Sequence, residues 1–436
     1  MAWDQAAGTG EAARPGLRDY VALGILSGTV GLNTVDRNMF GLLLPLIQKD
    51  IHISDTVLGF LMGPAFVIVY SIAGVPIAWI ADHAGRRNII AFGLGLWSAV
   101  TALTGFATTM AHLLIVRILL GIGEASNMAP SSALIGDMFR GRYRVMAMAI
   151  FAAGGPLAIM VFYPVIGWVA EHRGWRPAYP IMGAIGIALA LVIFLFIREP
   201  QQDVAARAAI KGESEALTLG QAAGTVLRSG TFLLLCLGGT MVSIAYSALL
   251  AWLPSFMERV HGLHSQDIGA LLGMYKGLLG VAATIAGGLL VTWLMRFDGR
   301  WLAWAPALFC LGMVPAQMML LLAKDPLWWH IGLALETLLL SGVTPCLFTL
   351  VITLLDARIR ATGTALYLLI FNLIGQSVGP LAIGALNDGP LVRFGADAIR
   401  YSLLTAPAVL ALGALLLFLL SLAMNQKGRA MQQVAS

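Results

Sequence analysis

Apolar runs of about 20 residues recur almost end to end in this 436-residue chain. Each is long enough to cross the ~30 Å hydrocarbon core of a bilayer as a helix. Charged residues make up 11% of the chain, against roughly 25% in soluble domains. Because backbone polar groups in lipid must be satisfied within the segment, runs of this length are expected to be helical. The sequence predicts an all-α membrane protein with many spans.

Charged residues divide the apolar sequence into twelve candidate spans, which puts both termini on one side of the membrane. The spans are 20–47, 55–81, 88–110, 112–138, 145–170, 176–197, 231–257, 266–295, 301–323, 327–354, 361–387 and 398–424. The only long polar stretch separates the sixth span from the seventh. The predicted organisation is a tail at 1–19, a six-helix bundle at 20–197, a linker at 198–230, a second six-helix bundle at 231–424 and a tail at 425–436.

Lysine and arginine are distributed unevenly between the loops on the two sides. The side holding the termini and the linker carries seventeen of them, and the other side carries seven. By the positive-inside rule, both termini and the linker are expected to be cytoplasmic, in the plasma membrane, which is the inner membrane of a bacterium. Topology accounts for the net charge of +5, so no binding to nucleic acid is expected.

Cysteine and histidine give no sign of a metal site or of an enzyme. The three cysteines lie far apart inside apolar runs, and the seven histidines fall in loops or at span ends. Neither set has metal-ligand spacing, and no nucleophile elbow is present. We expect no cofactor, no metal and no catalytic activity. Nothing resembles a pore filter, so a channel is not favoured either, and a monomer surrounded by membrane lipids is expected.

Six charged residues lie deep inside the candidate spans. Each costs about 2.5–3.5 kcal/mol near the bilayer centre on insertion scales, so they are expected to face one another, water or a substrate. Three are acidic and three are basic, which indicates an interior cavity lined by both signs. The six are Asp36, Arg37, Arg117, Glu124, Lys276 and Glu336.

Four of these charges form a set in the first half. Arg117 and Glu124 are two helical turns apart and share a face, whereas the adjacent Asp36 and Arg37 point about 100° apart. A buried carboxylate near an arginine can change protonation when its partner moves. Our hypothesis is that Asp36 and Glu124 carry a coupling proton, with Arg37 and Arg117 as counter-charges. The alternative is that the six charges form static ion pairs that hold helices together. This interpretation is favoured more for Lys276 and Glu336 than for the other four.

The loop between the second and third spans carries a recognisable motif. It reads Ala78-Trp-Ile-Ala-Asp82-His-Ala-Gly85-Arg86-Arg87, which resembles the Gly-x-x-x-Asp-Arg-x-Gly-Arg-Arg loop motif of the major facilitator superfamily. Ala78 replaces the usual glycine and His83 the usual basic residue. The resemblance implies a cytoplasmic latch that holds the outward-facing state. It assigns gating roles to residues of this loop and of the fourth loop: Asp82, Gly85, Arg86, Arg87, Asp137 and Arg144.

Within that superfamily the chain is similar to Spinster-like transporters over most of its length. The most specific string is Arg117-x-x-x-Gly121-x-Gly123-Glu124-Ala125. Other matches include Val35-Asp36-Arg37, Gly174-Trp175-Arg176, Arg198-Glu199-Pro200, Trp252-Leu-Pro254 and Gly379-Pro380. The resemblance implies twelve helices in two pseudo-symmetric bundles, alternating access and export of lipid-like molecules. It also implies that the first-span acid and the fourth-span glutamate, Asp36 and Glu124, act in coupling. Gly155-Pro156 keeps only a fragment of the antiporter motif.

The second half supplies polar and aromatic groups within its spans. With Lys276 as a cation among aromatic walls, the cavity suits an amphipathic anion with an apolar tail. The candidate substrate-binding residues are Tyr246, Trp252, Lys276, Glu336, Tyr367 and Asn372, accompanied by Tyr275 and Gln376.

The leading hypothesis is a proton-coupled secondary transporter that exports a lysophospholipid or a sphingosine phosphate. Two alternatives stay open. One is a symporter for small organic anions such as sugar acids or aromatic acids, in which Arg37 or Arg117 binds a carboxylate. The other is drug efflux.

Overall fold

The computed structural model describes residues 15–139, 142–197, 224–298, 300–355 and 359–435. Within these ranges all regular secondary structure is helical. The first 14 residues and most of the predicted linker, 198–223, lie outside the described residues. The first half of the chain comprises α1 (Leu17–Ile51), α2 (Asp55–Met62), α3 (Pro64–Ala84), α4 (Arg86–Thr104), α5 (Met110–Glu124), α6 (Met128–Met138), α7 (Arg142–Arg173) and α8 (Ala178–Phe196).

The second half follows the predicted linker and is also built from helices. It comprises α11 (Gly230–His261), α12 (Ser265–Leu272), the π-helix η1 (Gly273–Leu279), α13 (Gly280–Leu294), α14 (Trp301–Leu322), α15 (Pro326–Leu354), α16 (Arg360–Leu373), α17 (Gly375–Asp388), the 3₁₀ helix η2 (Val392–Asp397), α18 (Ala398–Leu403) and α19 (Thr405–Ala435).

The helices agree closely with the expected spans. Ten helices or joined helices in the described ranges are long and apolar enough to cross a membrane. The two expected spans outside this set are α1 and α4. Polar residues explain why: α1 carries Asp36 and Arg37 in its interior, and α4 begins with two arginines and an asparagine. Both helices nevertheless pack within the bundle, α1 against α7 and α4 against α8.

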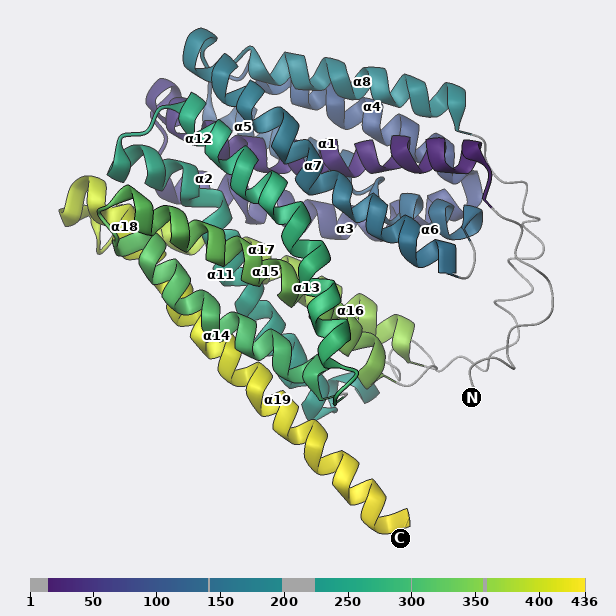
Figure 1. The fold of residues 1–436 in the computed structure, drawn as a ribbon. Helices are drawn as coiled ribbons and strands as arrows, with labels where there is room; N and C mark the ends of the chain where they lie inside the picture. The colour runs from purple at the N-terminus through teal and green to yellow at the C-terminus, as the bar shows by residue number, and fades with distance from the viewer. Residues whose placement is uncertain (1–14, 140–141, 198–223, 299, 356–358, 436) are drawn as a thin grey trace.

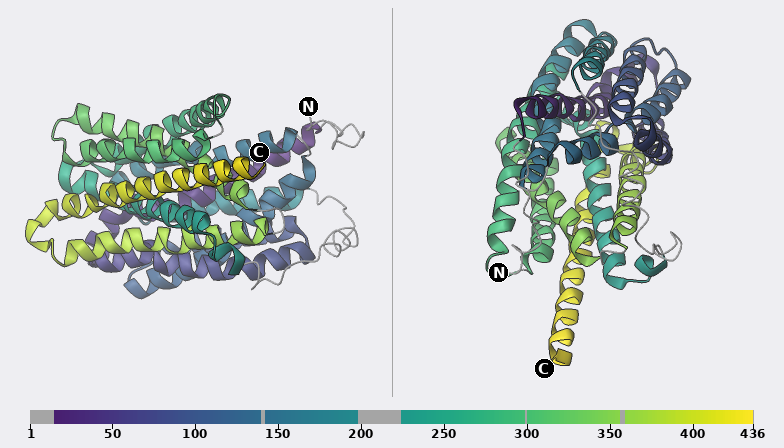
Figure 2. Two further views of the ribbon diagram at one scale, coloured as in Figure 1. Left: turned by 90° about the horizontal axis from the view of Figure 1, so that it is seen from below. Right: turned by 90° about the vertical axis from the view of Figure 1, so that its right-hand side faces the viewer.

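Long helices run side by side between two ends of the molecule (Figure 1). α1 begins and α19 ends at the same end (Figure 2), as an even number of spans requires. We call this the terminal end. The other, here called the far end, holds the C-terminus of α1, the N-terminus of α2, the C-termini of α11 and α17, and α18.

Small residues allow the helices to approach closely. A Cβ atom added to Gly154 on α7 would lie 2.1 Å from the Ser27 carbonyl oxygen of α1, and one on Gly31 would lie 2.8 Å from the Ala158 Cβ. Such contacts replace the hydrophobic driving force that is missing between helices in lipid. They fix the rotation of α1, and so the directions of the charges it carries.

Four expected spans are interrupted in the middle. The second breaks at Gly63, the fourth after Glu124, and the eleventh at Ile374, and the eighth contains the π-helix η1. Interrupted membrane helices expose backbone groups and are tolerated where they are buried in protein or line a cavity. Glu124, Lys276 and the cavity residues Met62 and Gln376 lie at or next to these breaks.

Candidate functional site

Asp36 and Arg37 leave α1 in different directions, as their adjacent positions predict. The Asp36 side chain is buried against α4, where its Oδ2 accepts hydrogen bonds from Trp97 Nε1 at 3.1 Å and Thr101 Oγ1 at 3.3 Å. Arg37 lines a cavity between the halves. Its guanidinium lies over two rings of α3, 4.8 Å from the centroids of both Phe66 and Tyr70. Asp36 therefore belongs to the helix packing, and Arg37 belongs to the cavity wall.

Glu124 ends α5 at the interruption of the fourth span and is almost fully buried. Its Oε2 accepts a hydrogen bond from Asn33 Nδ2 at 2.9 Å and lies 3.4 Å from Arg37 Nη2. The other oxygen, Oε1, has no hydrogen-bond partner among the described residues, and neither does Asp36 Oδ1. The network therefore contains two buried carboxylates, each with an oxygen left unpaired.

Arg117 lies on α5 two helical turns before Glu124. Its guanidinium is 4.0 Å from the centroid of the Phe40 ring, and the residue is buried. No carboxylate of the described residues lies within ion-pair distance of it. Arg117 thus supplies positive potential near Asp36 and Glu124 rather than a direct partner.

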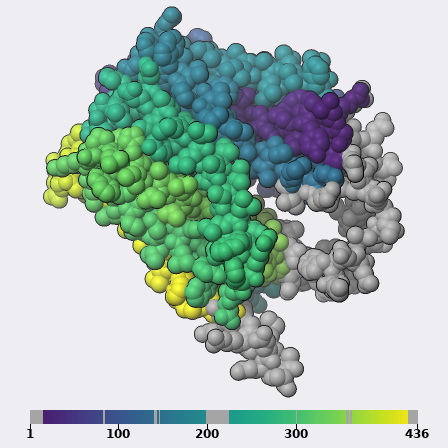
Figure 3. All heavy atoms as spheres, viewed as in Figure 1, coloured from purple at the N-terminus to yellow at the C-terminus, as the bar shows by residue number. Residues whose placement is uncertain are grey.

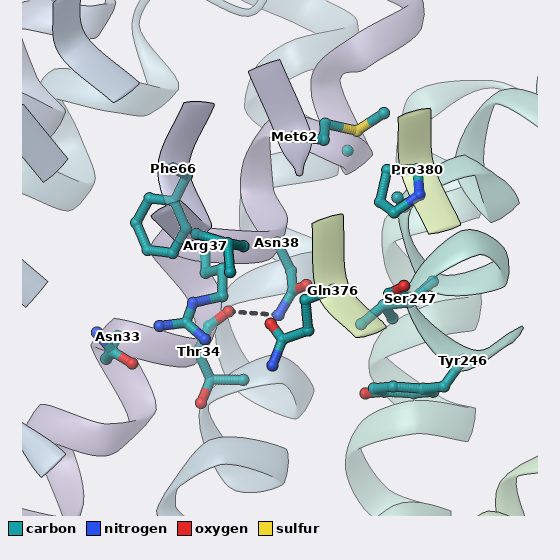
Figure 4. A pocket seen from close by; sticks show the side chains of 14 residues that line it. Asn33, Thr34, Arg37, Asn38, Met62, Phe66, Tyr246, Ser247, Gln376 and Pro380 are labelled. Carbon is teal, nitrogen blue, oxygen red and sulfur yellow. Dashed lines mark hydrogen bonds between the residues drawn. The ribbon is translucent and has the colours of Figure 1, made fainter. Parts of the chain in front are cut away.

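The cavity has a volume of about 210 Å³ and lies between the halves (Figure 4). The first half contributes Arg37 with the amides of Asn33 and Asn38. The second half contributes Gln376 and the aromatic ring of Tyr246. In Figure 4 the Gln376 amide faces Asn38 and Arg37 from the opposite wall. The remaining lining is mostly apolar and includes Met62, Phe66, Val67, Leu250 and Pro380. A cation with surrounding amides, next to an apolar wall, can bind an anion that also carries an apolar group.

The structure places the predicted substrate residues of the second half in three environments. Tyr246 lines the cavity. Asn372 lies one turn before Gln376 and accepts its side-chain hydrogen bond at 2.5 Å. Trp252 and Tyr367 are buried among helices: the Trp252 indole donates to the Pro380 carbonyl oxygen at 2.9 Å, and Tyr367 packs in the core of the second half.

Lys276 and Glu336 form a buried ion pair across the second half. Lys276 lies on η1 and Glu336 on α15, and Lys276 Nζ contacts Glu336 Oε2. Neither residue lines the cavity described above. The sequence-based interpretation that these charges pair with each other agrees with this geometry.

The loop motif lies at the terminal end. Gly85 adopts a φ of 92°, which only glycine adopts without strain, and turns the chain between α3 and α4. Arg86 pairs with Asp137 of α6. Arg87 lies over the Phe194 ring and reaches the Ile197 carbonyl oxygen at 3.5 Å. Arg144 is exposed near Gly136. The Asp82 side chain lies outside the described residues.

Several cavity residues were not among the predicted site residues, namely Asn33, Asn38, Ser247 and Phe66. Helical spacing could have identified one of them. Asn33 is four positions before Arg37, so it lies on the same face of α1 one turn away. Ser247 follows Tyr246 directly and donates a hydrogen bond to the Gly375 carbonyl oxygen at 2.8 Å, next to the break in the eleventh span. Neutral polar residues carry a weak signal because many of them pair within their own helix, as Asn38 does with the Thr34 carbonyl.

The described residues contain no group of three or more histidine, cysteine or acidic side chains that could hold a metal ion. The three cysteines are buried as free thiols.

Comparisons with known proteins identify the family. The model of the Major Facilitator Superfamily matches residues 26–380. The chain is 30% identical to an MFS-type efflux pump of Mycolicibacterium smegmatis, over 91% of this chain and 90% of that protein. It is 26% identical to the Sphingosine-1-phosphate transporter SPNS2 of Danio rerio, over 95% of this chain and 86% of that one.

A solved structure shares the fold. It is a bacterial homologue of the human lysosomal transporter Spinster in an inward-facing, unoccupied conformation. It superposes with a TM-score of 0.76 at 24% identity, covering 93% of this chain and 97% of that chain. The helical architecture, the buried charges at the interrupted spans and these similarities lead to one conclusion: the chain belongs to the Major Facilitator Superfamily, is similar to its Spinster-like members, and is a membrane transporter rather than an enzyme.

Proposed function

We propose that this protein is a proton-coupled secondary active transporter that works by alternating access and exports an amphipathic anion of the lysophospholipid or sphingosine-phosphate kind. We also propose that both termini are cytoplasmic and that it resides in the plasma (bacterial inner) membrane. The observation that carries the proposal is the buried Glu124 carboxylate, which is held by Arg37 and Asn33, two residues that line a cavity between the halves.

The coupling chemistry follows from this contact. Protonation of Glu124 removes the negative charge that faces Arg37, and deprotonation restores the pair. The charge available to an anion in the cavity therefore changes with the protonation of Glu124. Asp36, whose carboxylate is held by Trp97 and Thr101 on the adjoining face, serves as the second proton carrier, with Arg117 supplying the counter-potential.

The lining supports an amphipathic substrate. The Arg37 guanidinium is followed along the wall by Phe66, Val67, Met62 and Leu250. An anionic headgroup can bind the guanidinium while an adjoining apolar segment contacts these side chains. The similarity to an efflux pump and to a sphingosine-1-phosphate transporter supports export and the lipid-like class.

Transport by purified protein in liposomes tests the coupling. Asp36→Asn and Glu124→Gln are expected to abolish substrate movement driven by a pH difference, while exchange without a gradient continues. Asp298→Asn is the matched control, because this exposed carboxylate pairs with the nearby Arg300 and does not line the cavity. Unchanged pH-driven transport in both site variants would contradict proton coupling by these residues.

A second candidate substrate class is favoured by the cavity volume. About 210 Å³ with three amides and a guanidinium also suits a small organic anion, taken up with protons. A series of lysophospholipids of increasing chain length, tested beside glucuronate, an aromatic acid and a cationic drug, separates the classes. Binding that strengthens with chain length supports the lipid-like substrate, whereas transport of glucuronate alone supports the symporter.

A further inference from the structure

The second half contains a buried charge pair for which the coupling proposal has no use. The Lys276 side chain is 9% exposed and the Glu336 side chain is 0% exposed. Glu336 Oε2 contacts Lys276 Nζ and lies 3.5 Å from Thr337 Oγ1, whereas Glu336 Oε1 has no hydrogen-bond partner among the described residues. A fully buried carboxylate that leaves one oxygen unpaired is an expensive way to hold two helices together, because apolar residues could do so at no greater cost.

The backbone at Lys276 is unusual as well. Lys276 lies on η1, a π-helical stretch of seven residues between α12 and α13. π-Helical turns are rare and are found often at functional sites. They are less stable than an α-helix. We therefore interpret η1 as a segment that turns the Lys276 side chain in a direction that a regular α-helix would not give it.

η1 also lies at the boundary between the two halves. A Cβ atom added to Gly277 would be 2.6 Å from the Met160 Cα of α7, and one on Gly273 would be 3.0 Å from Pro164. The face of η1 that carries these glycines therefore packs directly on the first half. When the halves move during transport, the segment that carries Lys276 must move against α7.

The pair is connected to the cavity through Tyr246. This cavity-lining residue interacts electrostatically with both Glu336 and Arg37. Glu336 is paired with Lys276 from η1 and interacts electrostatically with Tyr246 from α11. The Lys276 side chain is 9% exposed and the Glu336 side chain 0%, so the ammonium group is the more accessible of the two.

We propose that Lys276 is a second binding residue for the substrate's anionic headgroup, in addition to Arg37 of the cavity, and that Glu336 is an internal anion which occupies that position when the substrate is absent. The proposal rests on the proposed function and assigns the headgroup subsite of the same transport cycle. When the substrate anion takes Lys276, the displaced Glu336 carboxylate binds a proton from water, because a buried carboxylate without a counter-charge is unstable. The hydronium ion that supplies this proton becomes water, and no other covalent bond forms or breaks in this exchange.

Two substitutions have opposite expected effects, which a static ion pair does not predict. Lys276→Met removes the binding cation and is expected to weaken anion binding by at least about 30-fold. Glu336→Gln removes the internal competitor and is expected to strengthen it by about tenfold. Lys276→Arg keeps the cation and is expected to stay within about tenfold of the parent. For a purely structural pair, both neutral variants would lose stability and neither would bind more tightly.

The experiment measures equilibrium binding in detergent with four probes. Lysophosphatidic acid carries a phosphate and a tail, monoacylglycerol the tail alone, inorganic phosphate the anion alone, and glucuronate a small carboxylate. Lysophosphatidic acid is expected to bind most tightly to Glu336→Gln, less tightly to the parent protein and least tightly to Lys276→Met. The affinity for monoacylglycerol is expected to be the same in all three. If glucuronate shows that order instead, the subsite serves a small anion. Lys324→Met, an exposed cation, and Asp298→Asn are the matched controls.

Thermal unfolding of each variant accompanies the binding data. If Glu336→Gln does not fold, Glu336→Asp replaces it, because the shorter side chain retains the charge but reaches Lys276 less well and should strengthen binding by a smaller factor. The proposal is overturned if both substitutions weaken binding equally, or if no anionic probe binds the parent protein saturably. The measurement needs no proton gradient. If Glu124→Gln loses pH-driven transport but Glu336→Gln does not bind more tightly, this inference alone is rejected. If Glu336→Gln binds more tightly but Glu124→Gln keeps pH-driven transport, the coupling proposal alone is rejected.

Discussion

At the far end of the bundle a cluster of polar bonds joins the two halves, whereas at the terminal end the ion pair of the loop motif lies within the first half. The centre of the far-end cluster is Asp55, the first residue of α2, which is buried. It binds Arg259 of α11 at 2.6 and 2.7 Å and accepts from Asn387 of α17 at 2.8 Å. By contrast, Arg86 and Asp137 connect α4 to α6 of the same half.

The difference shows which end resists opening in this conformation. Bonds between halves must break when the far end opens, whereas a bond within one half can survive that movement. Figure 3 shows the surfaces of the two halves in contact toward the far end and separated toward the terminal end. The far-end bonds are therefore expected to set the conformational equilibrium, and substitutions there should act in proportion to the burial of the bond removed.

The largest effect is expected from Asp55→Ala. It leaves Arg259 and Asn387 without their acceptor, and breaking a buried pair from one side costs about 3–5 kcal/mol. The far end should open in most molecules, and the unfolding temperature should fall. Spin labels at Arg173 and Val392, exposed residues of the two halves at this end, measure the opening as a longer distance. Because the native cysteines are buried, the labels can be placed selectively. An unchanged distance would show that other contacts keep this end closed.

A steric substitution should break the same contact without removing a charge. A Cβ atom on Gly59 of α2 would lie 2.4 Å from the Pro380 carbonyl oxygen of α17. Gly59→Ala should push these helices apart and shift the equilibrium by about 1–3 kcal/mol, the usual cost of overpacking. Gly74→Ala is the matched control, since no atom lies within 4 Å of its added Cβ. Equal label distances in the two variants would rule out close packing as a determinant of closure.

Arg259→Lys should have a smaller effect. The guanidinium binds both oxygens of Asp55 and also Gln48 Oε1 at 2.6 Å, a fork that an ammonium group cannot reproduce. The charge remains, so about 1–2 kcal/mol is expected to be lost. The label distance distribution should show a minor open population. Added salt should enlarge this population less than it would if the broken ion pair were exposed, because buried charges are screened less. A distance distribution like that of Asp55→Ala would mean that the fork geometry of the guanidinium, rather than its charge, keeps the far end closed.

Lys49→Gln should have the smallest effect. Lys49 Nζ lies 2.5 Å from Glu258 Oε1 across the same boundary, but the lysine side chain is 69% exposed. Exposed pairs of this kind contribute less than about 1 kcal/mol. Label distances and the unfolding temperature should stay near those of the parent. A clear opening would show that the peripheral pair contributes as much as the buried one, and the contrast between the two ends would then need another explanation.

Much of the candidate site could be predicted because charge inside an apolar run is a local signal. Asp36, Arg37, Glu124, Lys276 and Glu336 were all identified as interior charges, and each is found in a buried network or pair. Aromatic residues were less informative. Trp252 and Tyr367 lie inside apolar runs in the same way as Tyr246, yet only Tyr246 lines the cavity. Which face of a helix meets the cavity depends on neighbours that the local sequence does not name.

The far-end cluster illustrates the same limit. Asp55, Arg259 and Asn387 lie at span ends, where charges and amides are common and usually solvated. Their partnership depends on α2, α11 and α17 ending at the same place. Spacing along the chain carries no information about such contacts.

Hydrophobicity and charge along the chain determined the membrane location, the positions of nearly all helices and the presence of a charged interior, because lipid excludes unpaired polar groups from every segment independently. The loop motif and the Arg-x-x-x-Gly-x-Gly-Glu-Ala string determined the family. Only the tertiary structure decided that Arg37 shares Glu124 with Asn33, that Asp36 faces Trp97 and that Lys276 reaches Glu336 from a π-helical turn. These choices depend on the rotation and depth of helices far apart in sequence, which the close packing of small residues fixes only when the helices meet.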